Sequence, residues 1–237
     1  MKLQQLSSKV WILPAHPDDE KIQPAAGVVI GGNETVLIDA GNTPRLARDL
    51  LTKLRAMKVP PVKHIIYTHY HWDHVFGACV FDAPVTAHFL CKKKLLEFAK
   101  LSWSEEGLQT SVEKCMIRAE SAKIIRAGVD DWSTFKVVLP IQTFEEKETL
   151  VGEDYRLELT HVDSKHSNDS ILVEVVGEGV MFVADAFYPA PLRVNPNDRA
   201  LDRMVLKTML ASVAEIFVHG HGDPLTRAEV QEILELA

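Results

Sequence analysis

A short segment of the chain gathers several side chains of the kind that bind metal ions. His69, His71, Asp73 and His74 fall within six positions and follow a β-branched run that predicts a strand over 64–68. Imidazole and carboxylate groups are both good ligands for zinc, iron or manganese. If the strand continues into this segment, His69 and His71 share one face, and the other two residues follow in a turn. The spacing therefore predicts a metal site at the end of this strand.

Three further candidate ligands follow along the chain. His166 precedes a predicted strand, Asp185 ends another, and His221 lies between two glycines. By itself His166 is weak evidence, because a lone histidine is often on the surface or satisfied in the core, and Asp185 could simply cap a helix. His221 is a moderate signal, because its flanking glycines could serve any tight turn. Their order behind the cluster at 69–74 is what makes them candidates.

The order and spacing resemble the H-x-H-x-D-H motif of the metallo-β-lactamase superfamily and the ligand motifs that follow it, from about residue 27 to residue 224. The resemblance implies an α/β (α+β) fold, the four-layer αββα metallo-β-lactamase sandwich. It also implies two divalent metal ions, zinc before iron or manganese. The ligands would be His69, His71 and His166 for one ion and Asp73, His74 and His221 for the other, with Asp185 bridging.

The resemblance implies a reaction as well. A hydroxide bound between two metal ions forms near neutral pH and would cleave an ester, lactone, thioester or amide bond of a small molecule. Asp73 would orient this nucleophile. Tyr188 is similar to a tyrosine of the N-acyl homoserine lactonases and is a candidate donor to the oxyanion or leaving group. Asp39 matches an early aspartate of the family that orients ligands.

The loop around His166 departs from the family pattern. Lys165 and Asp169 stand where many members have glycine. Because a residue with a side chain restricts the backbone, we expect this loop to follow a different path. The substrate class of any one subfamily is therefore not transferred to this chain.

Three alternative functions stay open at this point. An iron-dependent sulfur dioxygenase uses an overlapping ligand set, and a non-catalytic binding protein could keep the fold. The segment 15–20 also resembles the H-P-D-D motif of LmbE-like zinc deacetylases, which have a Rossmann-like fold. There, His16 and Asp19 would bind zinc and Asp18 would act as the base. Otherwise this segment is a polar loop that overhangs the active site.

Length and composition limit the possibilities further. With 237 residues, of which 46% are hydrophobic, the chain predicts a single domain, with a helical insertion at about 89–125. A net charge of −7 argues against a nucleic-acid partner. No signal peptide or membrane span is visible, and the three cysteines lack metal or disulfide spacing. We therefore expect a cytoplasmic protein that acts on a small molecule, without a membrane or nucleic-acid partner.

The elements that must position the site follow from hydrophobic periodicity. Helical patterns cover 43–57, 199–211 and 227–236. We expect Tyr70 and Trp72 to face the core. Short apolar runs between turn residues predict strands over 9–13, 27–30, 35–39, 64–68, 85–87, 157–161, 170–176, 180–184 and 215–218.

Overall fold

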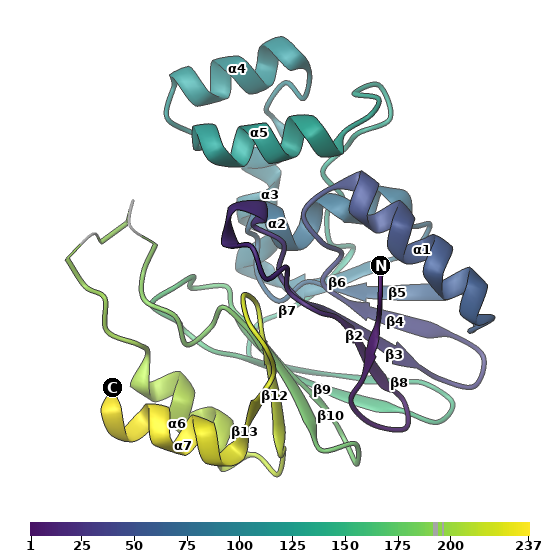
Figure 1. The fold of residues 1–237 in the computed structure, drawn as a ribbon, viewed down its shortest axis with the longest axis vertical. Coiled ribbons are helices and arrows are strands. Elements are labelled where there is room, and N and C mark those ends of the chain that lie inside the picture. The colour runs from purple at the N-terminus through teal and green to yellow at the C-terminus, as the bar shows by residue number, and fades with distance from the viewer. Residues whose placement is uncertain (192–193, 196) are drawn as a thin grey trace.

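The computed structural model describes residues 1–191, 194–195 and 197–237, and the strands in this part of the chain form two sheets (Figure 1). The first sheet follows the chain order: β1 (Gln4–Gln5), β2 (Val10–Leu13), β3 (Ala26–Ile30), β4 (Thr35–Ile38), β5 (Val62–Ile66), β6 (Val85–His88) and β7 (Gln142–Phe144). The second sheet has the order β13-β12-β11-β10-β9-β8, with β8 (Lys147–Val151), β9 (Arg156–His161), β10 (Ile171–Val175), β11 (Val180–Ala184), β12 (Ile216–His219) and β13 (Leu225–Thr226).

The helices lie outside the two sheets (Figure 1). They are α1 (Pro44–Met57), α2 (Trp72–Val75), α3 (Phe89–Ala99), α4 (Glu105–Glu113), α5 (Ala119–Gly128), α6 (Arg203–Ala211) and α7 (Arg227–Leu236), with short 3-10 turns η1 (Asp19–Lys21) and η2 (Phe76–Val80). The predicted insertion thus corresponds to α3, α4 and α5. Among the described residues, no helix has the length and apolar character needed to cross a membrane.

Three buried clusters define the layers of the fold. One lies between the sheets and contains Ile38 of β4 and Phe182 of β11. A second packs the outer face of the first sheet against α1 and α3, through residues such as Leu50 and Leu95. A third packs the outer face of the second sheet against α6 and α7. Because β4 and β11 are covered on both faces, their sequences are continuous apolar runs. The predicted αββα sandwich is confirmed.

The differences from the predicted elements lie at the edges. All nine predicted strands are present within two residues of their expected bounds, but β1, β7, β8 and β13 were not predicted. Most of their residues are exposed, so they lack the apolar pattern that identifies a buried strand. Helix α6 begins at Arg203 rather than at Arg199, because the Asp202 side chain caps it by accepting from the N–H groups of Met204 and Val205.

His88 is a buried histidine outside the set of predicted metal ligands. Its side chain is 1% exposed at the end of β6 and stacks on His161 of β9, with ring centroids 3.8 Å apart and an interplanar angle of 7°. Burial, helped by the neighbouring His161, lowers the pKa of His88 to about 4. The folded protein therefore holds this imidazole neutral.

This neutral imidazole makes stability depend on pH. Between pH 6.5 and pH 4 the unfolded chain binds a proton at His88 that the folded chain excludes, so stability falls as the pH falls. We expect a loss of at most about 3 kcal/mol from this group. Urea unfolding of the wild type and of His88→Phe across that range measures it, because the variant lacks the titration. Parallel stability curves for the two proteins would contradict the assignment.

Candidate metal centre

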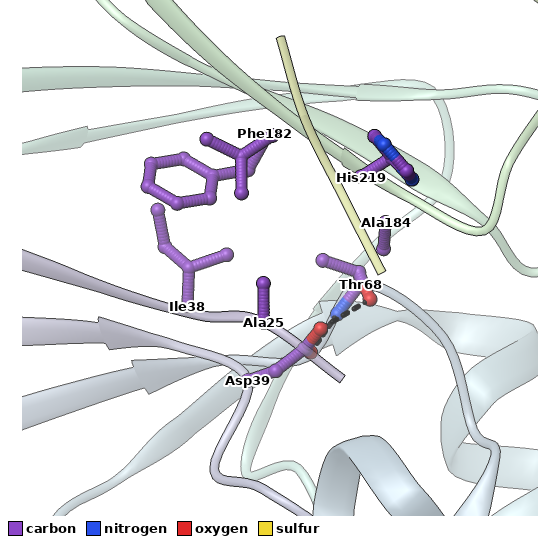
Figure 2. Close-up of a pocket in the computed structure, with 8 residues that line it drawn as sticks. Ala25, Ile38, Asp39, Thr68, Phe182, Ala184 and His219 are labelled. Carbon is purple, nitrogen blue, oxygen red and sulfur yellow. Dashed lines mark hydrogen bonds between the residues drawn. The ribbon is translucent and has the colours of Figure 1, made fainter. Parts of the chain in front are cut away.

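The loop that follows β5 carries His69 and His71. Strand β5 ends at Ile66, so the two histidines lie in the loop beyond the strand and not in the strand itself. The loop is fixed from both sides instead. The N–H and hydroxyl of Thr68 donate to the Asp39 carboxylate at 2.8 and 2.7 Å (Figure 2).

On the other side, the N–H of Tyr70 donates to Asp169 Oδ2 at 2.9 Å. Asp169 is fully buried in the loop that precedes β10, and it accepts from the residue that stands between the two histidines. Tyr70 and Trp72 are partly buried and pack against the core next to α1 and α3, as expected. This outward packing turns the alternate residues, His69 and His71, toward the interior of the site.

Helix α2 holds the next two candidate ligands, Asp73 and His74, in its first turn. His74 Nδ1 lies 2.7 Å from Asp39 Oδ2. A carboxylate can only accept, so Nδ1 carries the hydrogen and the lone pair of Nε2 faces the site. The same carboxylate thus orients both Thr68 and His74, which confirms that Asp39 contacts a candidate ligand rather than joining the ligand set.

The loop between β9 and β10 positions His166 without the glycines of the family pattern. Its N–H donates to Ser164 Oγ at 3.0 Å, and its Nδ1 lies 3.3 Å from the carbonyl oxygen of Pro189. The N–H of Lys165 donates to Asp202 Oδ2 at 3.0 Å. These side-chain contacts and Asp169 determine the path of the loop.

Asp185 and His221 follow the neighbouring parallel strands β11 and β12. The carboxyl ends of these strands lie at the same sheet edge, which brings the two side chains together. The approach is close: a Cβ at Gly220 would lie 1.9 Å from Asp185 Oδ1. A glycine before His221 is therefore a steric requirement of the site.

Four of the predicted ligands lie close to Asp185, and the other two lie close to those four. The Oδ2 atom of Asp185 lies within 3.2–3.9 Å of an Nε2 atom on each of four histidines, namely His166, His221, His74 and His69. His71 Nδ1 lies 3.0 Å from both His69 Nε2 and His166 Nε2. Asp73 Oδ2 is 3.4 Å from His221 Nε2 and 3.7 Å from His74 Nε2.

These separations form two potential metal-binding groups in the described part of the chain. The first contains His69, His71, His166 and Asp185, and the second contains Asp73, His74 and His221. Nitrogen ligands roughly 2.0–2.1 Å from one zinc ion lie about 3.3 Å apart at tetrahedral angles, which matches the 3.0 Å spacing of the first group.

The electrostatics of the cluster favour a cation. The carboxylates of Asp39, Asp73 and Asp185 are 2%, 6% and 3% exposed. Burial by itself lowers the pKa of His221, but Asp185 and Asp73 outweigh it and raise that pKa to about 10. The pKa of His74 is likewise raised well above its ordinary value by Asp39 and Asp185, against the effect of burial. The cluster therefore has more negative charge than neutral imidazoles can balance.

Two buried atoms of the cluster, His74 Nε2 and Asp185 Oδ1, have no hydrogen-bond partner among the described residues. Orphaned buried polar atoms are uncommon and costly in native proteins. Bare imidazole and carboxylate lone pairs at ligand spacing are the donor set of a zinc, iron or manganese site. The residues therefore fit a divalent metal ion.

Comparison with known proteins agrees with this geometry. The sequence model described as the Metallo-beta-lactamase superfamily matches residues 20–221, most of the chain. The chain belongs to this superfamily. The match runs from the 3-10 turn η1 to His221, so it includes all of the candidate ligands.

Individual relatives of the superfamily are distant. The chain is 24% identical to a linear primary-alkylsulfatase of Pseudomonas sp. (strain ATCC 19151), over 85% of the chain but only 42% of that protein. Among solved structures, a metallo-beta-lactamase from Pontibacter korlensis has a TM-score of 0.67 at 18% identity, covering 99% of this chain and 97% of its own. One from Hirschia baltica has a TM-score of 0.65 at 13% identity, covering 99% and 96%. At these identities the structures support the superfamily fold alone.

Tyr188 lies beside the predicted ligands, and its hydroxyl makes two hydrogen bonds. Its hydroxyl accepts from the N–H of His221 at 3.0 Å and is hydrogen-bonded to His219 Nδ1. Burial lowers the pKa of His219, so its ring is neutral and Nδ1 can accept the hydroxyl proton of Tyr188. Burial raises the pKa of Tyr188, so the hydroxyl stays protonated and can act as a donor.

The H-P-D-D segment lies outside the two metal-binding groups. His16 and Asp18 form a local turn, in which the N–H of Asp18 donates to His16 Nδ1 at 3.0 Å and the Asp18 side chain caps η1. Neither these residues nor Asp19 belong to the metal-binding groups found in the described residues. The two-sheet superfamily fold is not Rossmann-like, so the deacetylase alternative is wrong.

Proposed function

We propose that the protein is a metal-dependent hydrolase that cleaves an ester, lactone, thioester or amide bond of a small molecule at a centre of two divalent ions, zinc in the first place. The observation that carries this proposal is that the seven predicted ligands form two adjoining groups, with Asp185 Oδ2 within 3.9 Å of four histidine nitrogens from both groups. Such ions, when bound, lower the pKa of a water between them and neutralise negative charge as it develops on the substrate.

The predicted ligands would be shared between the two ions. His69, His71 and His166 would hold one ion, and Asp73, His74 and His221 would hold the other. Asp185 Oδ2 is near enough to imidazoles of both groups to bridge them. Asp39 would keep the Nε2 lone pair of His74 directed at the metal, because it accepts the hydrogen of Nδ1.

Two side chains would act on the substrate itself. Asp73 would accept a hydrogen bond from the attacking water and so orient it. The protonated hydroxyl of Tyr188 would turn from His219 to donate to the oxyanion or leaving group, at a cost of one hydrogen bond. The acidic charge of the chain favours a small molecule over nucleic acid as the partner.

The test is a hydrolysis panel on zinc-, manganese- and iron-loaded protein, with metal content measured on the same samples. The panel contains lactones, glutathione thioesters, β-lactams, phosphodiesters and an alkyl sulfate ester. We expect turnover of one acyl class, its loss on chelation, and its recovery when metal is restored. Chelator-insensitive turnover would contradict the proposal.

Other outcomes identify other functions. A single iron per chain with oxygen-dependent turnover of a thiol would favour a sulfur dioxygenase. Protein that binds neither metal nor any substrate would favour a binding protein without catalysis.

Tyr188→Phe should lower the rate at saturating substrate and leave the metal content unchanged, since the hydroxyl is not in the ligand set.

A further inference from the structure

The cleft beside the metal centre has an apolar wall that the ligands do not use. It has a volume of about 490 Å3 and is bounded on one side by ligands such as His71 and Asp185. Cavities of this size hold small organic ligands. The rest of the lining is mostly apolar and comes from five separate parts of the chain: Ile22, Trp72, Phe98, Met116 with Ile117, and Pro191.

Met116 and Ile117 bring the segment between α4 and α5 to this wall. Met116 is 43% exposed, so its side chain is accessible to a molecule in this cleft. Methionine is flexible and adapts to the shape of an apolar ligand. The helical insertion therefore contributes a surface suited to a hydrocarbon chain.

Ile22 reaches the same wall from the segment that follows β2. Its backbone is left-handed, with φ 42° and ψ 49°. For a β-branched residue this conformation is strained and persists only where the surroundings enforce it. The Asn42 side-chain amide enforces it here, by donating to the carbonyl oxygens of Lys21 and Ile22 at 3.2 and 2.8 Å. These hydrogen bonds thus hold an apolar side chain in the lining of the cleft beside the metal centre.

A second cleft adjoins the first and has a different chemistry. Its volume is about 760 Å3, and it shares Ile22, Arg118, Tyr188 and His221 with the apolar cleft. Arg199 adds a second guanidinium to this lining, against one carboxylate, that of Asp19.

Arg118 stands where the two clefts join. Its Nε atom lies 3.7 Å from the Glu120 carboxylate, but the two side chains are 70% and 65% exposed, so the pair is weak. Arg199 contacts a carbonyl oxygen, that of Ala190, at 3.4 Å. Guanidinium groups present planar donors that match carboxylate, sulfate and phosphate groups.

We propose that the substrate is an amphiphile in which an apolar acyl chain is joined through an ester, thioester or amide bond to a small anionic group. The chain lies between Ile22 and the segment around Met116, and the anionic group pairs with Arg118 and Arg199. This inference rests on the proposed hydrolase function and names its substrate class. In the reaction, the oxygen of water bonds to the acyl carbon, the bond to the leaving heteroatom breaks, and that heteroatom takes up the proton.

N-acylglycines test the two halves of the inference separately. The probes are N-butanoyl- to N-decanoylglycine and their neutral glycinamide counterparts, with affinity for zinc-loaded protein measured by calorimetry. Each added methylene should tighten binding about fourfold until the apolar cleft is full. Each acid should bind at least about fivefold more tightly than its amide, because only the acid pairs with the arginines.

Variants then assign each preference to its side chains. Ile22→Gly and Met116→Gln should flatten the dependence on chain length and leave the acid-over-amide preference intact. Arg118→Gln combined with Arg199→Gln should do the opposite. Leu96→Gln is the matched control, since Leu96 is 40% exposed on α3 but does not line the cleft, and it should change neither. Ile22→Gly should not lower the melting temperature, because glycine relieves the backbone strain.

Each half can fail by itself. Affinity that is independent of chain length, or a length dependence that survives both apolar variants, would overturn the acyl-chain assignment. An acid preference that survives the double arginine variant would place the carboxylate on the metal ions and overturn the anion assignment. Binding needs no turnover, so the expected binding pattern without hydrolysis of any probe or panel compound would contradict the proposed reaction and leave the ligand class in place.

Discussion

Asp185→Ala should lower metal content and hydrolytic activity together. Its Oδ2 atom is the one carboxylate oxygen in the described part of the chain that lies within 3.9 Å of imidazoles from both metal-binding groups. Under the proposed function its removal would take a ligand from both ions. Loss of a residue that merely orients a ligand costs about 10–100-fold in metal affinity or activity. We expect a direct bridging ligand to exceed that range, with a loss of activity above about 100-fold.

Metal analysis and activity on the same samples check this expectation. Asp49→Ala is the control, because Asp49 is an exposed carboxylate on α1 and belongs to neither metal-binding group. It should retain both metal and activity. If Asp185→Ala kept full activity with unchanged metal content, the bridging assignment would be wrong.

Gly77→Ala should cause a large loss of stability. A Cβ at Gly77 would lie 2.0 Å from the carbonyl oxygen of Ala40 and 2.9 Å from the Cβ of Ala47. Neither neighbour can move by rotating a side chain, so the backbone of η2 or of the segment after β4 must shift. Overpacking of this kind costs about 3 kcal/mol or more.

The same shift would reach the metal centre. The N–H of Ala40 donates to the carbonyl oxygen of His74 at 2.8 Å, and Ala40 follows Asp39, which orients that histidine. Gly77→Ala should therefore weaken metal binding in the protein that still folds. Urea unfolding and metal titration measure the two effects.

Gly32→Ala provides the comparison for Gly77→Ala. A Cβ there would meet only the carboxylate end of Glu153, at 3.3 Å, which can rotate away. We expect a change within about 0.5 kcal/mol. Equal stability losses for the two glycine variants would show that the close approach to Ala40 is not the cause.

The local sequence was sufficient to identify the fold and to select the residues that converge. Strands β4 and β11 are continuous apolar runs because both of their faces are buried. The six-residue cluster from His69 to His74 is recognisable because imidazoles and a carboxylate so close together are costly unless they share a bound metal ion. These properties belong to neighbouring residues, so they leave a pattern that can be read without the tertiary structure.

Only the tertiary structure shows what holds those residues in place. Asp169 supports the loop of His71 from 99 positions away along the chain, and Asp202 supports the loop of His166 from 37 positions away. Hydrogen bonds over such separations impose no spacing on the sequence, so the departures at Lys165 and Asp169 could be noticed but not explained. The strained Ile22 and the exposed Met116 meet at one cleft for the same reason. Their proximity is a consequence of packing between distant segments, which no periodicity in the chain records.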